Sequence, residues 1–123
     1  MERVAFITTE QRDADLIVSF VIEGEAPGGV KSLILMRSPK YEFVFDDHER
    51  GVNVSHEDFP ERDDELLRRI EIASDVVTIE STHNRFELDV SRVERKEITK
   101  ACTILHKMNF DDRFAFEMAR SHG

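Results

Sequence analysis

Apolar and polar residues alternate along most of the first 90 residues, and this alternation predicts half-buried β-strands. In the segment 15–23, for example, Val18, Phe20 and Ile22 fall on one face. The segment 30–37 is apolar on both faces, which predicts a central strand. The predicted strands span residues 4–8, 15–23, 30–37, 41–45, 52–54, 75–81 and 85–90.

The segment from residue 55 to residue 73 carries two patterns. Pro60 suits a first helical position and acidic residues follow it, which predicts a short helix near 60–67. The residues from Arg69 to Ala73 alternate instead, as in a strand. We therefore expect a short helix followed by a strand.

The apolar period changes at Ser91, from two residues to between three and four. Ser91 and Glu94 match the S-x-x-E capping box, which predicts a helix from Arg92. Four residues at helical spacing form its apolar face: Ile98, Ala101, Cys102 and Leu105. Residues 111–118 fit a short second helix that begins at an aspartate, but the alternation of their apolar residues equally suits a strand.

Together these patterns predict one α+β domain over residues 1–123, with mainly strands in 1–91 and a helical region in 92–123. Because most connections are short, we expect a predominantly antiparallel meander sheet of about six to eight strands. A C-terminal amphipathic helix follows it and, as one of two alternatives, a short second helix. This order of elements is similar to that of pleckstrin-homology-like domains, although no motif is shared. The resemblance implies a barrel closed by a helix.

Composition narrows the class of protein. Apolar residues make up 40% of the chain, which is too many for a disordered protein. The single cysteine, Cys102, excludes an internal disulfide and fits a cytoplasmic protein. No apolar stretch reaches the roughly 18 residues of a membrane span, and the N-terminal apolar run is too short for a signal peptide. No cofactor motif is present, so no cofactor is expected.

Charge is unevenly distributed along the chain. Residues 1–91 contain 10 Lys and Arg against 21 Asp and Glu, a balance of −11, whereas residues 92–108 have a balance of +3. Four basic residues lie on the helix face opposite the apolar stripe: Arg95, Lys96, Lys100 and Lys107. Such a face is either solvated or in contact with an acidic surface of another protein or of a second copy. Nucleic acid is not expected as a partner, because the acidic remainder would repel phosphates.

The segment 46–65 is rich in histidine and acidic residues. Four of its side chains would bind a divalent metal ion if a hairpin brought them together: Asp46, His48, His56 and Asp58. The segment matches no established metal motif, and the same residue types are common in turns. A metal site, a small-ligand site or an enzyme built on this segment is therefore the alternative hypothesis.

The sequence shows no recognisable set of catalytic residues. Ser55 and His56 are adjacent, but no G-x-S-x-G elbow is present. Cys102 lies on the apolar helix face, where burial would raise its pKa. We expect a small cytoplasmic protein-binding or regulatory domain without catalytic activity. Its surplus aromatic residues would line either the core or the contact: Tyr41, Phe59, Phe110, Phe114 and Phe116.

Overall fold

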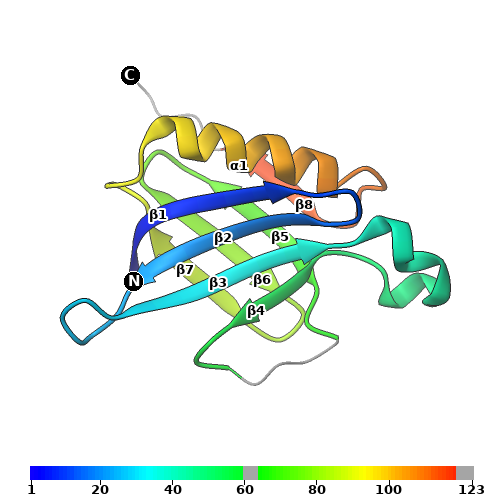
Figure 1. Ribbon diagram of the computed structural model, residues 1–123, viewed down its shortest axis with the longest axis horizontal. Helices are drawn as coiled ribbons and strands as arrows, with labels where there is room; N and C mark the ends of the chain where they lie inside the picture. Colours follow the sequence, from blue (N-terminus) through cyan, green and yellow to red (C-terminus); the bar gives the residue numbers. More distant parts are fainter. Residues whose placement is uncertain (60–63, 119–123) are drawn as a thin grey trace.

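Eight β-strands and one α-helix make up the computed structural model, which describes residues 1–59 and 64–118 (Figure 1). The strands are β1 (Glu2–Gln11), β2 (Leu16–Glu23), β3 (Val30–Arg37), β4 (Asn53–His56), β5 (Leu67–Ile72), β6 (Val76–Ser81), β7 (Arg85–Asp89) and β8 (Ala115–Met118). The helix α1 (Arg95–Met108) precedes β8, and two short 3-10 helices, η1 (Pro39–Val44) and η2 (Asp47–Glu49), connect β3 to β4. The predicted α+β class is confirmed.

The strands form one mixed sheet in the order β4-β3-β2-β1-β7-β6-β5-β8. Consecutive strands from β1 to β4 and from β5 to β7 pair antiparallel. Short connections predict this for every pair except β3–β4, whose connection spans residues 38–52. The pairs β1–β7 and β5–β8 are parallel. An isolated bridge joins Asn53 to Leu66, but the sheet is not closed. The analogy with a pleckstrin-homology-like barrel is therefore not confirmed.

The helix α1 packs on β1 and β2 and covers the core between the curled halves of the sheet (Figure 1). Four buried side chains form its inner face: Ala101, Ile104, Leu105 and Met108. Ile98 and Cys102, which belong to the predicted apolar face, are only half-buried. The buried face of α1 is therefore rotated toward Ile104 relative to the prediction. Glu97 accepts the backbone N–H of Ile7 at 2.8 Å and ties α1 to β1. Packing of this apolar face, more than helix propensity, stabilises α1.

The helix begins later than the capping-box pattern predicts. Its N-cap is Glu94 and its first residue is Arg95. The backbone N–H of Ser91 donates to the carboxylate of Asp89 at 2.9 Å, and residues 91–93 form a turn. Ser91 therefore closes the end of β7 and does not cap α1.

Residues 115–118 form the strand β8, so of the two alternatives for this segment the strand is confirmed and the short second helix is wrong. The Asn109 side chain donates to the carbonyl oxygen of Phe114 at 2.9 Å and accepts its N–H at 3.2 Å. These two bonds set the turn after α1, and β8 then pairs with β5. The Phe116 ring stacks on His106 of α1, with centroids 4.6 Å apart. Tertiary contacts thus select the strand over the helix.

The prediction of a strand over residues 41–45 is also wrong, because most of this segment belongs to η1. Pro39 occupies the first turn, where its missing N–H is not needed. The carboxylate of Glu42 binds the guanidinium of Arg37, five residues earlier. An extended chain of that length spans about 17 Å. The chain must therefore turn after β3 for this contact to form.

The helix predicted near 60–67 falls in part on residues 60–63, which lie outside the described residues. The strand expected over 69–73 is β5. Within the described ranges, no helix has both the length and the apolar character needed to cross a membrane.

Candidate protein-binding site

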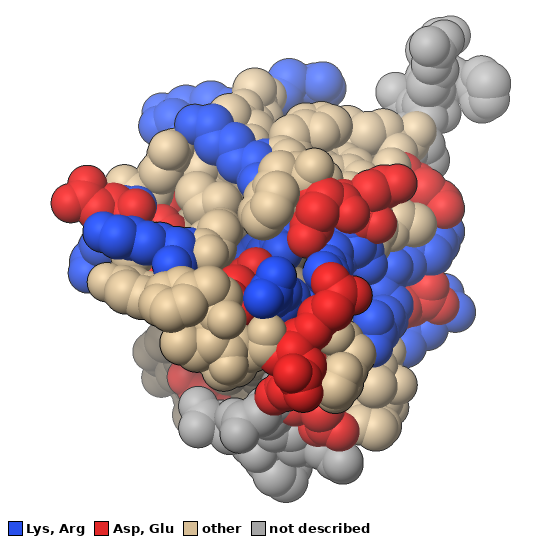
Figure 2. All heavy atoms as spheres, turned by 90° about the vertical axis from the view of Figure 1, so that its right-hand side faces the viewer, with Lys and Arg blue, Asp and Glu red and all other residues tan. Residues whose placement is uncertain are grey.

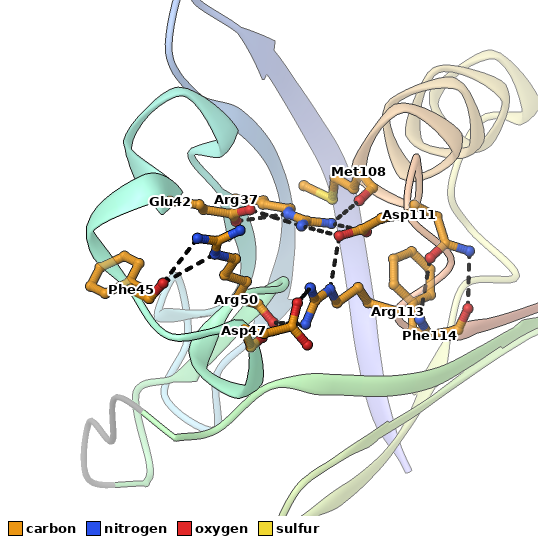
Figure 3. Close-up of polar contacts among 10 residues, drawn as sticks. Arg37, Glu42, Phe45, Asp47, Arg50, Met108, Asp111, Arg113 and Phe114 are labelled. Carbon is orange, nitrogen blue, oxygen red and sulfur yellow. Dashed lines mark hydrogen bonds and ion pairs between the residues drawn. The ribbon is translucent and has the colours of Figure 1, made fainter.

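A buried arginine at the end of β3 organises one end of the molecule. The Arg37 side chain is 0% exposed, and its Nε and Nη2 donate to the two carboxylate oxygens of Glu42, both at 2.8 Å (Figure 3). Its Nη1 donates to the carbonyl oxygen of Met108 at 2.7 Å and to Asp111 at 2.8 Å, and Nη2 also reaches Asp111 at 2.9 Å. A guanidinium has five N–H donors. All five are used, so Arg37 has no donor left for an anionic ligand.

The charges of this cluster stabilise one another. Burial by itself would lower the pKa of Arg37, but the hydrogen bonds to Asp111 and Glu42 outweigh it and raise that pKa above its ordinary value. The hydrogen bond from Arg37 holds the pKa of Asp111 well below its usual range, and Arg113 adds to this effect. The ring of Phe110 covers the Arg37 guanidinium at 4.2 Å from its centroid. The cluster is therefore charged at neutral pH and structural in character.

Arg113 extends the cluster from the turn after α1 to η2. Its Nε donates to Asp111 at 2.8 Å, and its Nη2 donates to the carboxylate of Asp47 at 2.6 Å (Figure 3). Arg50 donates from Nε and Nη2 to the carbonyl oxygen of Phe45, at 3.2 and 3.0 Å. These bonds attach η1 and η2 to the rest of the molecule at several points.

Four apolar side chains on this anchored segment face the solvent. Their exposed fractions are 53% for Tyr41, 76% for Phe43, 67% for Val44 and 47% for Phe45, and we call these four residues the aromatic loop. Glu42, in the middle of η1, is buried by its bonds to Arg37, and this directs its neighbours outward. Figure 2 views this end of the molecule, where acidic and basic side chains meet near the centre and uncharged surface lies beside them. Contiguous exposed apolar surface is typical of interaction sites, so this segment is the candidate site.

A cleft of about 500 Å³ adjoins the aromatic loop. Ten residues line it: Met36, Arg37, Ser38, Tyr41, Glu42, Phe45, Glu49, Gly51, Asn53 and Leu66. Met36 and Asn53 also line a second hollow of about 400 Å³ over the outer face of β2 and β3. Half-buried Ile17 and Ile34 contribute apolar surface there. The apolar surface thus continues from the aromatic loop onto the sheet.

The four predicted basic residues of α1 are all exposed: Arg95, Lys96, Lys100 and Lys107. Lys96 forms an ion pair with Glu94 at 3.1 Å, and the Nζ of Lys107 donates to Gln11 at 2.7 Å. Arg95 also lines a cleft of about 330 Å³ at the start of α1. The structure therefore places these residues on the solvent side of the helix, where the sequence predicts them.

The four predicted metal ligands divide between two clusters. Asp46 and His48 lie with Glu49 on η2, and all three are exposed. His56 and Asp58 lie with Glu2. The hairpin that would have united the four residues does not form, because η1 and η2 occupy the chain before β4.

The buried His56 is bonded on both ring nitrogens. Its Nε2 lies 3.1 Å from a carboxylate oxygen of Glu2, and its Nδ1 accepts the backbone N–H of Asp58 at 3.0 Å. Lys31 binds the Asp58 carboxylate at 2.6 Å, and the His56 ring stacks on Phe86 with centroids 5.3 Å apart. These contacts link β4 to β1, which gives the cluster of His56, Asp58 and Glu2 a structural role. A metal ion would have to replace them.

The lone cysteine lies in an environment that disfavours its thiolate. Cys102 is half-buried, burial raises the pKa of its thiol, and its sulfur lies 4.0 Å from that of Met118. A thiol with a raised pKa is a poor nucleophile at neutral pH.

Sequence analysis missed the Arg37 cluster, although one signal for it was present. The period of two places Arg37 on the same face of β3 as Leu33 and Leu35, which are both buried. An arginine on a buried face requires carboxylate partners. Those partners, Glu42 and Asp111, lie in segments whose folding was not predicted correctly.

The chain matches no known protein-family model, no curated protein and no solved structure.

Proposed function

We propose that this chain is a binding domain without catalytic activity that docks a partner protein on the aromatic loop and the adjoining cleft. The observation that carries the proposal is the exposure of Tyr41, Phe43, Val44 and Phe45 on one anchored segment. Aromatic residues are enriched in the centres of protein interfaces, where they bury large areas with little loss of conformational freedom.

The buried ion cluster supports this proposal. Replacement of a buried ion cluster by apolar side chains is often neutral or stabilising, so stability alone does not account for one. Here the cluster holds η1 in a conformation that buries Glu42 and exposes aromatic side chains. Prior anchoring of a binding loop reduces the entropy lost when a partner docks.

The basic face of α1 is a separate proposal for contact with an acidic surface of another protein or of a second copy. Its side chains are exposed, and their contacts, such as those of Lys96 with Glu94 and of Lys107 with Gln11, lie at the surface, so they are available for such a contact. The single cysteine favours a reducing compartment, so we also propose a cytoplasmic location.

A capture experiment tests the main proposal. The wild-type chain, the double variant Phe43→Ser/Phe45→Ser and the control Val30→Ser are immobilised and exposed to an extract of the source cells. Val30 is 59% exposed on β3, outside the aromatic loop. We expect a protein that is retained by the wild type and by Val30→Ser and lost by the double variant. After identification, the partner is purified and its affinity for each chain is measured by calorimetry.

Circular dichroism melting is used to check that the double variant is folded. A partner that binds this folded variant as tightly as the wild type, or an extract that yields no specific protein with any of the three chains, would count against the proposed site.

A further inference from the structure

The cleft beside the aromatic loop combines aromatic rings with a carboxylate. Tyr41 and Phe45 line it together with Glu49, the last residue of η2. One oxygen of Glu49 accepts the backbone N–H of Asp46 at 3.4 Å, which is a long bond. Among the described residues, no hydrogen bond reaches its other oxygen. The carboxylate is exposed and can accept donors from a ligand.

Among the described residues, Arg37 is the one cation that lines the cleft, and Lys40, Arg50 and Arg113 lie outside its lining. All five donors of Arg37 are bonded, Arg50 donates to the carbonyl oxygen of Phe45, and Arg113 donates to Asp47 and Asp111. The Nζ of Lys40 lies 6.0 Å from the centroid of the Tyr41 ring, at the outer limit of a cation–π contact, and Lys40 does not line the cleft. The charge that the cleft offers to a ligand is therefore negative.

The surroundings have the same sign. Asp46, Asp47 and Glu49 lie on or beside η2, and residues 1–91 together carry a balance of −11. A field of this sign attracts cationic partners and repels phosphates and acidic segments.

We propose that the partner docks by placing an arginine side chain of a basic segment in this cleft, with its guanidinium between the rings of Tyr41 and Phe45 and the carboxylate of Glu49. This inference rests on the proposed function and names the chemistry of the partner. Arginine fits better than lysine, because a planar guanidinium stacks on aromatic rings and binds a carboxylate through two N–H groups. Its aliphatic stem would cover apolar surface of the aromatic loop.

The test uses two synthetic peptides, acetyl-Gly-Ser-Arg-Gly-Ser-amide and its citrulline counterpart, which has nearly the same shape but no charge. Each is titrated into the ¹⁵N-labelled full chain, to millimolar concentration, and amide shifts are followed by NMR. We expect the arginine peptide to shift the amides of Tyr41, Phe45 and Glu49 and the citrulline peptide to shift them much less. A lysine peptide forms a third arm and should bind more weakly than the arginine peptide.

Two variants and one control complete the experiment. Glu49→Gln removes the charge but keeps an acceptor for the Asp46 N–H, and Tyr41→Leu removes the ring but keeps an apolar side chain. Each should weaken binding of the arginine peptide about tenfold. The control Glu25→Gln alters an exposed carboxylate in the loop between β2 and β3, at the opposite end of the sheet (Figure 1), and should have no effect.

Absence of shifts, equal shifts with citrulline, shifts spread over all acidic surfaces, or binding that Glu49→Gln leaves unchanged would each overturn the inference. If capture of the partner depends on Phe43 and Phe45 while the arginine peptide fails, the proposed function stands and only the chemistry assigned to the partner is wrong. If capture also fails, both proposals fall.

Discussion

The aromatic loop and the basic face of α1 are two exposed surfaces that are held in opposite ways. The basic face consists of charged side chains on a helix whose position is set by apolar packing underneath, and its cations make exposed contacts, such as Lys96 with Glu94 and Lys107 with Gln11. The aromatic loop has the reverse arrangement, with apolar side chains outside and the charges of Arg37 and Glu42 inside. Hydration of charged side chains is enough to explain the exposure of the basic face. It does not explain the exposure of the apolar side chains of the aromatic loop, which is why we propose this loop as the main binding surface.

The two surfaces also differ in the loss of folding stability that a substitution causes. Arg37 is fully buried, and its carboxylate partners come from η1 and from the turn after α1, far apart in the sequence. Loss of one member leaves the others charged and poorly solvated. On α1, loss of a lysine exposes nothing that was buried. Four predictions test this contrast, from the largest expected effect to the smallest.

Arg37→Met should cause the largest loss of stability. It leaves the carboxylate of Glu42 without its cation and that of Asp111 with Arg113 alone, and removal of one member of a buried ion pair costs about 3–5 kcal/mol. Urea unfolding followed by circular dichroism measures the change. The control is Arg69→Met, because Arg69 binds three carboxylates, one more than Arg37, but its side chain is 29% exposed. An equal loss in both variants would contradict the special role of burial at Arg37.

Asp111→Asn should reduce stability by about 1.5–3 kcal/mol at neutral pH, because it removes charge-assisted hydrogen bonds to Arg37. Since the folded state lowers the pKa of Asp111 from its ordinary value of 3.8, the stabilisation by the carboxylate is present above that pH. It is lost as the pH falls below 3.8 toward the lower pKa of the folded state.

The free energy of unfolding of Asp111→Asn should therefore approach that of the wild type on acidification from pH 7 to pH 3. Asp112→Asn, at the neighbouring exposed aspartate, is the control. A gap between wild type and Asp111→Asn that is the same at both pH values would refute the linkage.

Lys96→Glu/Lys100→Glu reverses charge on the basic face and should change the free energy of unfolding by less than about 1 kcal/mol, since exposed ion pairs contribute little. If the face contacts an acidic surface, the variant should lose self-association in light scattering or lose an acidic partner. Unchanged association in both assays would show that the face is only solvated.

Phe43→Ser should have the smallest effect on stability, within about 0.5 kcal/mol, because substitutions at exposed sites rarely cost more. Thermal melting measures it, with Phe20→Ala in the core as the contrast at about 3–5 kcal/mol. Phe43 is 76% exposed and Phe20 is 1% exposed. A large loss in Phe43→Ser would mean that the aromatic loop supports the fold and is not reserved for binding.

Much of the fold could be predicted from residue patterns. The strand over residues 30–37 has the bounds that its apolar run predicts, and the segment after Ser91 contains the amphipathic helix. Of the proposed binding site, the sequence pattern places Tyr41, Phe43 and Phe45 in a strand and singles out Tyr41 as a surplus aromatic residue. The alternation of Tyr41, Phe43 and Phe45 is compatible with a strand. The contact between Arg37 and Glu42 decides against it.

By itself, the sequence determined which segments are amphipathic, because burial of apolar side chains follows the local period of two or of 3.6 residues. It also determined the basic face of α1, since position on a helix follows from spacing alone. Only the tertiary structure decided that β1 pairs in parallel with β7 and β5 with β8, that residues 41–45 turn into η1, and that His56 and His48 lie in separate clusters. The physical reason is that these outcomes depend on contacts between residues distant in the chain. The carboxylates that neutralise Arg37 are an example, because Asp111 lies 74 residues away in sequence and reaches it only once α1 has packed on the sheet.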